Sequence, residues 1–330
     1  MDGLCVTYSR FGIPEQVVTV ENKKVEKPGY GEILVRMLDR PINPSDLIPI
    51  TGAYAHRISL PAIPGYEGVG IVEEAGDSVS RELLGKRVLP LRGEGTWQQF
   101  VKAPAQWAVR VPDCIEDYTA AQLYINPVTA WLACTEVLHL QQDDVLVVNA
   151  CGSSIGRIFA QLAKILGFRL IAVTRNDSYT KELLQLGASY VINTTKTSLR
   201  SAVLELTEGL GANAAIDSVG GLDGADLAYS LRSNGTILTI GLLSGMPVQW
   251  AEVTQKTNVN VKLFHLRHWN EQVTGQAWHE VFNRLMSLIT DKKLELMKPA
   301  SFYDLSSVRE AVQAARSAEG NNGKIFLTSI

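Results

Sequence analysis

The sequence predicts an α/β protein of two domains, in which a β-rich domain is followed by a doubly wound parallel sheet. The chain has 330 residues, more than one ordinary hydrophobic core holds. Short β-type runs fill its first third, and after about residue 120 continuous apolar strands alternate with helical segments. We place the β-rich domain at residues 1–120, the parallel-sheet domain at 121–262, and a return to the first domain at 263–330.

The first third predicts short strands separated by tight turns. The β-type runs are Glu32–Leu38, Gly68–Ala75 and Gln98–Lys102. Turn signals such as Pro28-Gly29 and Pro64-Gly65 bound these runs. Many short strands at this spacing favour a small barrel or sandwich.

The middle of the chain predicts strands that are covered by helices on both faces. The expected strands are Asp144–Asn149, Arg169–Thr174, Tyr190–Ile192, Ala214–Asp217 and Thr236–Ile240. The expected helices are Pro127–Leu138, Ile155–Leu166, Ser178–Leu186, Leu199–Glu208 and Asp223–Arg232. Continuous apolar strands between amphipathic helices indicate a parallel sheet. The tail adds the helices Trp278–Ile289 and Ser307–Ala315 and the strand Ile325–Leu327.

Composition and charge exclude several classes of protein. Apolar residues make up 46% of the chain, which argues against general disorder, and a formal net charge of −3 gives no reason to expect binding to nucleic acid or to an anionic membrane. No stretch approaches the ~20 apolar residues of a membrane span, and the start lacks the pattern of a targeting segment. Four widely spaced cysteines favour buried thiols in a reducing compartment. We therefore expect a cytoplasmic protein.

The turn after the first strand of the parallel sheet predicts a dinucleotide site. Such a site needs a turn with small residues, because backbone N–H groups and the N-terminus of the next helix must approach the pyrophosphate. The candidate residues are Gly152, Ser153, Ser154, Ile155 and Gly156. As a glycine motif the match is degraded, but its position between a strand and a helix supports it. We add Gly241, directly after the strand Thr236–Ile240, as a further cofactor-binding candidate.

The second strand of this sheet indicates which dinucleotide binds. An NAD site usually carries an acidic residue ~20 residues beyond the glycine loop. Arg175 stands nineteen residues beyond Gly156, and no carboxylate follows until Asp177. A cation at this point suits the 2′-phosphate of NADPH, so we predict NADPH as the cofactor.

Several segments along nearly the whole chain resemble the medium-chain dehydrogenase/reductase superfamily. They are Ile42–Asp46, Leu60–Gly68, Thr129–Trp131, Gly152–Gly156 with Gln161–Ala163, and Leu186–Ala188. The resemblance implies a GroES-like β-rich domain followed by a Rossmann domain. That order matches the prediction made from the strand and helix patterns.

The segments that hold zinc in other members differ here, and we therefore predict no metal. Zinc needs nitrogen and sulfur ligands at fixed spacing. No cysteine stands shortly before Asp46, Tyr66 replaces the zinc histidine before Glu67, and no cysteine lies near Asn126. The lobe that carries four structural cysteines is also absent from Leu89–Phe100.

Two zinc-free branches are candidates, the mitochondrial-type 2-enoyl thioester reductases and the quinone oxidoreductases of the zeta-crystallin type. Both carry a tyrosine like Tyr54. Four more segments of this chain resemble the enoyl thioester reductases: Gly95–Trp97, Asn126–Ala130, Asn149–Ser153 and Phe264–Trp269. In the last of these, His265 stands where that family has a tryptophan. We therefore expect a relative of the enoyl thioester reductases, with an NADPH:quinone or enone oxidoreductase as the alternative.

The resemblance also implies roles for individual residues. Tyr54 is the expected catalytic donor, which stabilises an enolate oxygen or relays a proton. The residues expected near the substrate or the nicotinamide are Asn43, Trp97, Asn126, Thr129, Phe264 and Trp269. Asn43 and Asp46 have an alternative role in capping the turn Pro44–Leu47.

Two further expectations concern partners. An exposed terminal strand over Asn258–Leu263 would favour a homodimer that pairs the two sheet edges. The alternative to an enzyme is a protein that binds NADPH but turns over little or no substrate.

Overall fold

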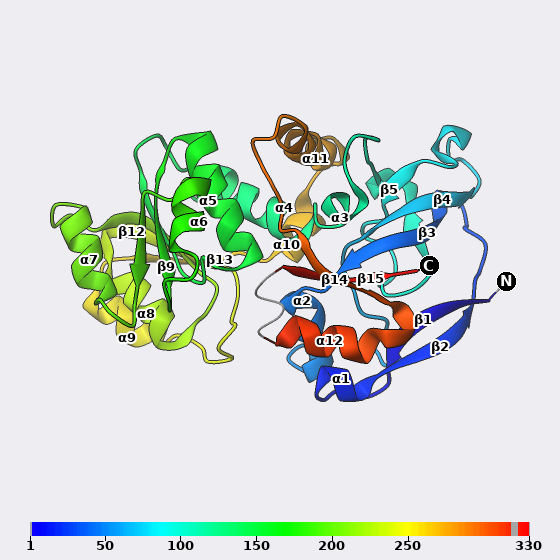
Figure 1. The fold of residues 1–330 in the computed structure, drawn as a ribbon, viewed down its shortest axis with the longest axis horizontal. Coiled ribbons are helices and arrows are strands. Elements are labelled where there is room, and N and C mark those ends of the chain that lie inside the picture. The colour runs from blue at the N-terminus through cyan, green and yellow to red at the C-terminus, as the bar shows by residue number, and fades with distance from the viewer. Residues whose placement is uncertain (1, 318–322, 330) are drawn as a thin grey trace. The chain divides into compact units, whose positions relative to one another are not determined.

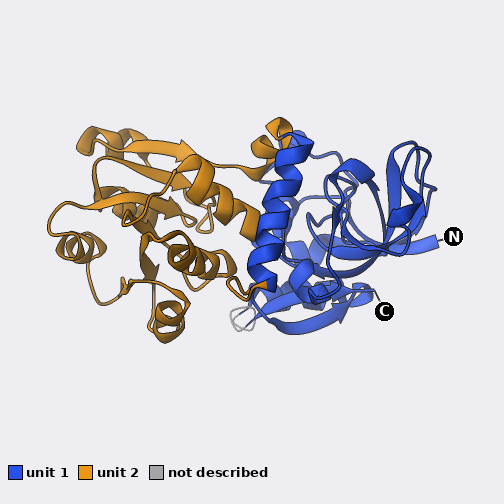
Figure 2. Ribbon diagram, turned by 90° about the horizontal axis from the view of Figure 1, so that it is seen from above, with its two compact units in different colours: residues 1–125, 274–290, 296–330 blue, residues 126–273, 291–295 orange. Residues whose placement is uncertain are grey.

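The computed structural model describes residues 2–317 and 323–329, and the chain forms two compact units. Figure 2 colours unit 1, which comprises residues 1–125, 274–290 and 296–330, apart from unit 2, which comprises residues 126–273 and 291–295. The sequence places the domain boundaries at residues 120 and 262, whereas the contacts divide the chain after residues 125 and 273.

Unit 1 is built on a mixed β-sheet (Figure 1). Its strands run in the order β14-β15-β3-β4-β5-β7, with β6 paired to β3, and β1 pairs with β2 in a separate ribbon. Their bounds are β1 Asp2–Tyr8, β2 Val18–Lys24, β3 Glu32–Pro41, β4 Val69–Ala75, β5 Arg87–Leu89, β6 Phe100–Pro104, β7 Val109–Arg110, β14 Pro299–Asp304 and β15 Lys324–Thr328.

The long strand β3 holds unit 1 together because it pairs with β4, β6 and β15. Ile33, Val35 and Met37 lie on one face of β3 and are buried in one core cluster, and Leu34 on the opposite face is buried as well. The antiparallel pairing of β15 with β3 brings the C-terminal segment back beside residues 39–41. The helices of this unit are α1 Pro14–Val17, α2 Pro44–Leu47, α3 Asp117–Ala120, α11 Gly275–Thr290 and α12 Val308–Arg316.

Unit 2 is a parallel sheet in the order β10-β9-β8-β11-β12-β13. The strands are β8 Val145–Val148, β9 Arg169–Thr174, β10 Tyr190–Asn193, β11 Ala212–Asp217, β12 Leu231–Thr239 and β13 Asn260–Leu263. All four residues of β8 are buried, because a central parallel strand is covered on both faces. The order reverses direction between β8 and β11, which makes the carboxyl ends of these two strands the topological switch point.

Helices precede, connect and follow the parallel strands. They are α4 Ile125–Leu132, α5 Ser154–Leu166, α6 Thr180–Leu186, α7 Leu199–Leu206, α8 Gly221–Tyr229, α9 Trp250–Lys256 and α10 Leu266–Gln272. α5 packs on α6 and β9, whereas α8 packs on α7, α9 and β11. Right-handed crossovers on either side of the switch point place these two groups of helices on opposite faces of the sheet. Gly167 ends α5 with φ 86°, a left-handed conformation that a glycine adopts without strain.

The predicted β-rich domain and doubly wound parallel sheet are confirmed, with local differences. The helix expected over Pro127–Leu138 is α4 followed by a wider π-type turn at Ala133–Val137. The helix expected to reach Arg232 ends at Tyr229, because β12 begins at Leu231. The strands β1, β2, β5, β7 and β14 were not predicted. β2 and β14 carry many polar residues, and β5 and β7 are only three and two residues long, so their apolar signal is weak.

Candidate functional site

The turn that follows β8 leads into the N-terminus of α5. Ser153 is the residue before the helix, and its hydroxyl accepts a hydrogen bond from the Gly156 amide at 3.3 Å. Ser154 and Ile155, which begin α5, are half-buried. The first turn of this 13-residue helix therefore presents backbone N–H groups and the positive end of the helix dipole, which suits a phosphate group.

The two glycines of this turn are required by close packing. A Cβ on Gly156 would lie 2.4 Å from the Cα of Cys151, so no side chain fits between helix and strand. A Cβ on Gly152 would lie 2.5 Å from the ring of Tyr179. The guanidinium of Arg157 lies over the ring of Tyr179, 5.0 Å from the ring centroid, in a cation–π contact. Arg157 also forms an ion pair with Glu182 at 2.8 Å. These contacts fix the shape of the predicted cofactor loop.

Arg175 lies directly after β9 and is exposed. Its guanidinium forms no hydrogen bond or ion pair with other residues in the described part of the chain. The nearby carboxylate of Asp177 is occupied, because it accepts from Lys196 at 2.5 Å and from Asn193 at 2.8 Å, and the Lys196 hydrogen bond lowers the pKa of Asp177. Arg175 is thus an available cation at the strand end where a dinucleotide ribose binds in doubly wound folds.

The switch point carries a buried polar cluster that sequence reasoning missed. The Asn149 amide donates to Asp217 Oδ1 at 2.7 Å, and Asn149 Oδ1 accepts from the Ser218 amide at 2.7 Å. Asp217 Oδ1 also accepts from the amides of Val219 and Gly220. The cluster joins the carboxyl ends of β8 and β11. The predicted residue Gly241 lies beside it, since a Cβ there would lie 3.0 Å from the Ser218 carbonyl oxygen.

The remaining candidates of unit 2 lie on α4 and around α10. Asn126 and Thr129 are half-buried on α4. Phe264 follows β13 and donates its amide to the Thr239 carbonyl at 3.0 Å, and Trp269 is half-buried on α10. His265 begins α10, and its Nδ1 accepts from the Arg267 amide at 3.2 Å. His265, which departs from the family pattern, therefore caps the N-terminus of α10.

In unit 1, Tyr54 lies between two short turns, Pro49–Thr51 and Ala55–Arg57. It is half-buried, and the guanidinium of Arg57 lies 3.9 Å from the centroid of its ring. A guanidinium over the face of a tyrosine is attracted by the ring quadrupole, so this contact restrains the ring. Sequence reasoning did not single out Arg57.

Asn43 lies in a buried polar network that also contains Glu67 and Lys324. Its side-chain amide donates to Glu67 Oε1 at 2.7 Å and accepts from Lys324 Nζ at 2.5 Å. Glu67 Oε2 accepts from the amides of Tyr124 and Ile125, at 3.1 and 2.8 Å. Burial raises the pKa of Glu67 and lowers that of Lys324. Glu67 therefore has a satisfied structural role that ties the start of α4 to this network.

Asp46 joins the same region. Its carboxylate accepts from the Asn43 amide at 2.7 Å and the Tyr66 amide at 3.1 Å. Burial raises the pKa of Asp46 to about 7. The contact with the Asn43 amide is the capping interaction expected around Pro44–Leu47.

Trp97 is fully buried in the main core cluster of unit 1. Its indole lies against Gly65, where a Cβ would come within 2.3 Å of the ring. The side chain therefore packs the interior in this structure, and it does not line an open channel.

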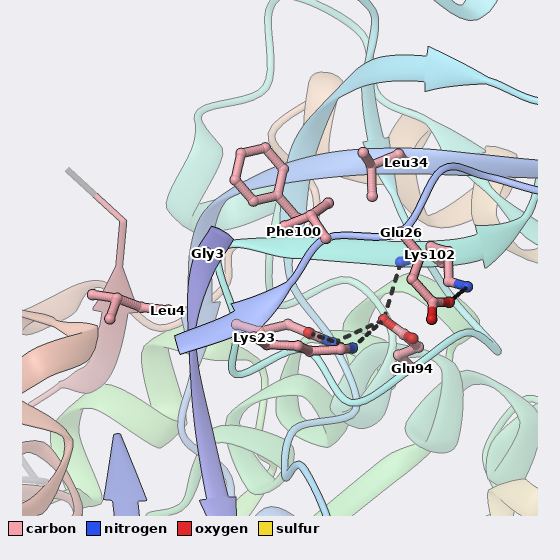
Figure 3. A pocket seen from close by; sticks show the side chains of 10 residues that line it. Gly3, Leu4, Lys23, Glu26, Leu34, Glu94, Phe100 and Lys102 are labelled. Atoms are coloured by element: carbon pink, nitrogen blue, oxygen red, sulfur yellow. Dashed lines mark hydrogen bonds and ion pairs between the residues drawn. The ribbon is translucent and has the colours of Figure 1, made fainter. Parts of the chain in front are cut away.

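A charged pocket lies elsewhere on unit 1, beside β1, β2 and β6 (Figure 3). Its lysines are paired within the pocket: Lys23 with Glu94 at 3.1 Å, and Lys102 with Glu26 at 2.9 Å. The pocket contains none of the predicted site residues. Because its charges neutralise one another, we assign no function to it.

Three more observations bear on the chemistry. Across residues 2–317 and 323–329, no three His, Cys, Asp or Glu side chains lie close enough together to hold a metal ion. Within the same residues, no helix is both long and apolar enough to cross a membrane. Cys5, Cys134 and Cys151 are buried free thiols, and burial raises the pKa of Cys151, in the turn between β8 and α5, to about 12.

Comparisons with known proteins agree with this architecture. Residues 29–113 match the family described as alcohol dehydrogenase GroES-like domain, and residues 154–291 match the family described as zinc-binding dehydrogenase. The mitochondrial enoyl-acyl-carrier-protein reductase of Dictyostelium discoideum is 30% identical over 88% of this chain and 86% of its own length. The Xenopus tropicalis protein of the same name is 34% identical over 86% of this chain and 83% of its own length.

Solved structures add a nearer relative. A Bacillus thuringiensis chain, provisionally named an NADPH:quinone reductase, is 60% identical, covers 100% of both chains and superposes with a TM-score of 0.98. The Escherichia coli quinone oxidoreductase complexed with NADPH, at 23% identity and a TM-score of 0.87, covers 98% of this chain and 99% of its own and shares the fold. The resemblance seen in the sequence is confirmed: the chain belongs to the zinc-free medium-chain dehydrogenases/reductases, the family that contains the mitochondrial enoyl reductases and the quinone oxidoreductases.

Proposed function

We propose that this protein is an NADPH-dependent oxidoreductase that reduces the carbon–carbon double bond of a 2-enoyl thioester. Family membership supports an oxidoreductase, and the names of the curated relatives support an enoyl thioester as substrate. The observation that carries the proposal is Tyr54, a half-buried phenol on a loop of unit 1 whose ring is restrained by Arg57.

The residues of unit 2 fit NADPH. The N-terminus of α5, capped by Ser153, suits the pyrophosphate, and Gly152 and Gly156 leave room for the backbone to approach it. Arg175, exposed and without a partner in the described residues, suits the 2′-phosphate. When bound, NADPH would supply the hydride that reduces the β-carbon of the substrate.

The chain's own contribution is to hold the substrate and to stabilise charge. As the β-carbon is reduced, negative charge develops on the thioester carbonyl oxygen, and a proton must reach the α-carbon. The phenol of Tyr54 is a neutral donor that would hydrogen-bond this oxygen as its charge grows. Such a donor needs no metal, which agrees with the replacement of the zinc histidine by Tyr66.

One solved structure favours a second candidate, an NADPH:quinone oxidoreductase, because that Bacillus thuringiensis chain is 60% identical to this one and carries the provisional name NADPH:quinone reductase. The deciding experiment follows NADPH oxidation with crotonyl-CoA and with phenanthrenequinone under the same conditions. We expect a higher kcat/KM for crotonyl-CoA. A higher value for the quinone selects the second candidate. Tight NADPH binding without turnover of either compound would exclude both and leave a protein that binds the cofactor only.

A further inference from the structure

Gly152 is the position in the predicted cofactor loop where packing and rigidity make opposite demands. A side chain does not fit there, because a Cβ would lie 2.5 Å from the ring of Tyr179. Glycine meets this packing demand, but it leaves the backbone with more conformational freedom than any other residue. A loop that binds a phosphate through its backbone gains affinity when its shape is fixed in advance, since ordering the loop on binding opposes association.

The peptide that joins Gly152 to Ser153 is held at both of its polar groups. The Gly152 carbonyl accepts a hydrogen bond from the guanidinium of Arg157. The Ser153 amide donates to the Ala150 carbonyl at 2.9 Å. This peptide therefore cannot rotate without breaking a hydrogen bond, and the carbonyl oxygen, which is the negative end of its dipole, is kept from turning toward a bound phosphate.

Arg157 is in turn held by residues at the start of α6. Its Nε and Nη2 donate to the two carboxylate oxygens of Glu182, each at 2.8 Å, and its guanidinium lies over the ring of Tyr179. Only 13% of the Arg157 side chain is exposed. Bidentate pairing with a carboxylate fixes the plane of a guanidinium. The group that donates to the Gly152 carbonyl thus has one orientation, set by the first turn of α6.

The stability of α5 does not explain why an arginine stands at position 157. Arg157 is the fourth residue of this helix, where the positive end of the helix dipole disfavours a cation. The first turn of α5 contains no acidic residue that would offset this charge. The compensating carboxylate of Glu182 comes instead from the first turn of α6. The contact with the loop therefore explains this arginine better than the helix that carries it.

We propose that Arg157 is a positioning residue for the cofactor. Paired with Glu182, it holds the Gly152 carbonyl and so fixes in advance the loop that receives the pyrophosphate of NADPH. It acts through the backbone and needs no contact with the cofactor. NADPH and NADH share the pyrophosphate, so Arg157 contributes equally to the binding of both, whereas Arg175 is expected to act on the 2′-phosphate alone.

Arg157→Lys tests the proposal, because lysine keeps the charge but, as a point donor, cannot hold both carboxylate oxygens and the Gly152 carbonyl together. We expect the dissociation constants of NADPH and NADH, measured by isothermal titration calorimetry, to rise by the same factor. That factor should be ~3- to 10-fold, as the loss of one hydrogen bond implies. Arg36→Lys is the matched control, because Arg36 forms an ion pair with Glu73 at 2.6 Å in unit 1, and it should change neither constant.

Glu182→Gln tests the second link in the chain of contacts. Glutamine keeps the size of the side chain but removes the charge that fixes the Arg157 guanidinium, so both dissociation constants should again rise together. Because 47% of the Glu182 side chain is exposed, this variant leaves the core intact and supplies the test if Arg157→Lys fails to fold. Its control is Glu252→Gln, in an exposed ion pair with Lys256 on α9.

The melting temperature of each variant separates positioning from a merely structural role. Unchanged dissociation constants in both variants, with or without a lower Tm, would show that the ion pair only stabilises unit 2 and would overturn the proposal. Weaker binding of NADPH alone would place Arg157 at the 2′-phosphate and would equally overturn it. Calorimetry needs no turnover, so the result stands whether the protein reduces an enoyl thioester, a quinone or neither.

Discussion

The guanidinium of Arg57 lies 3.9 Å from the ring centroid of Tyr54, so the ring of the proposed catalytic tyrosine is held by a contact that does not involve its hydroxyl. An exposed cation–π contact is worth ~0.5–1 kcal/mol, enough to favour one ring orientation. Since the contact is made to the face of the ring, a phenylalanine at this position would retain it. The hydroxyl can therefore be removed without releasing the ring.

Tyr54→Phe should lower kcat ~100- to 1000-fold, the usual cost of losing a donor to a developing oxyanion. The dissociation constant for NADPH should change little, because the ring and its Arg57 contact remain. Stopped-flow single turnovers with crotonyl-CoA measure the chemical step directly. Turnover at the wild-type rate would show that the phenol only packs.

Arg175→Ala should raise the KM for NADPH ~10-fold or more and leave the KM for NADH nearly unchanged. The reason is the loss of a charge-assisted hydrogen bond to the 2′-phosphate, a group that NADH lacks. Steady-state kinetics with both cofactors measure the difference. Lys181→Ala, an exposed cation on α6, is the control and should affect neither value. Equal effects of Arg175→Ala on both cofactors would place Arg175 outside the phosphate site.

The stability of the protein should fall as the pH rises between about 4 and about 7. The pKa of Asp46 is raised from 3.8 to about 7, so the folded state binds more protons than the unfolded state in this window. Asp46→Asn should reduce this slope of Tm against pH, although Glu67, whose pKa is also raised, keeps part of it. Asp77→Asn, at an exposed turn, is the control. A slope that is unchanged in Asp46→Asn would contradict the assignment.

Gly156→Ala should destabilise the protein by about 1–3 kcal/mol and weaken NADPH binding, because a Cβ there lies 2.4 Å from the Cα of Cys151. Thermal unfolding and a cofactor titration measure the two effects. Gly275→Ala provides the comparison, since a Cβ on Gly275 meets nothing within 4 Å. Equal melting temperatures for the two variants would show that the turn can relax around a side chain.

We expect a homodimer that pairs the edge strand β13 of two chains. β13 ends the sheet of unit 2, and its Val261 and Leu263 are 37% and 72% exposed. Leu263→Asp should shift the mass measured by light scattering toward the monomer at micromolar concentration. Leu210→Asp, at a loop residue that is 75% exposed, should not. A monomeric wild type would refute the expectation.

The sequence allowed prediction of those parts of the site that depend on local pattern. Gly152, Ser153 and Gly156 follow a continuous apolar strand, and Arg175 ends the next one, so their places could be read from strand and helix periodicity. The partnership of Asn149 with Asp217 could not be predicted, because it depends on β8 and β11 being neighbours although 68 residues separate the two side chains. Strand order is a tertiary property that periodicity does not encode.

Residues brought together by loops were also missed. The backbone amide of Tyr66 donates a hydrogen bond to Asp46 of α2, and this contact depends on how the loop between the two residues folds back onto α2. The resemblance implies a place near the substrate for Trp97, and packing in the core is the equally weighted alternative for an aromatic residue. Its burial follows from packing against Gly65, which a sequence alone does not show.

The burial of Cys151 protects its thiol from alkylation by electrophilic substrates. Enones, enoyl thioesters and quinones are electrophiles that alkylate thiolates, so an enzyme that binds them risks inactivation by each molecule it admits. With a pKa of about 12, the Cys151 thiol stays protonated at neutral pH, and the residue is fully buried. Burial raises the pKa of Cys134 and Cys5 as well, which leaves the exposed Cys114 as the thiol open to attack. The cofactor loop is thereby chemically inert toward the compounds that the protein is proposed to reduce.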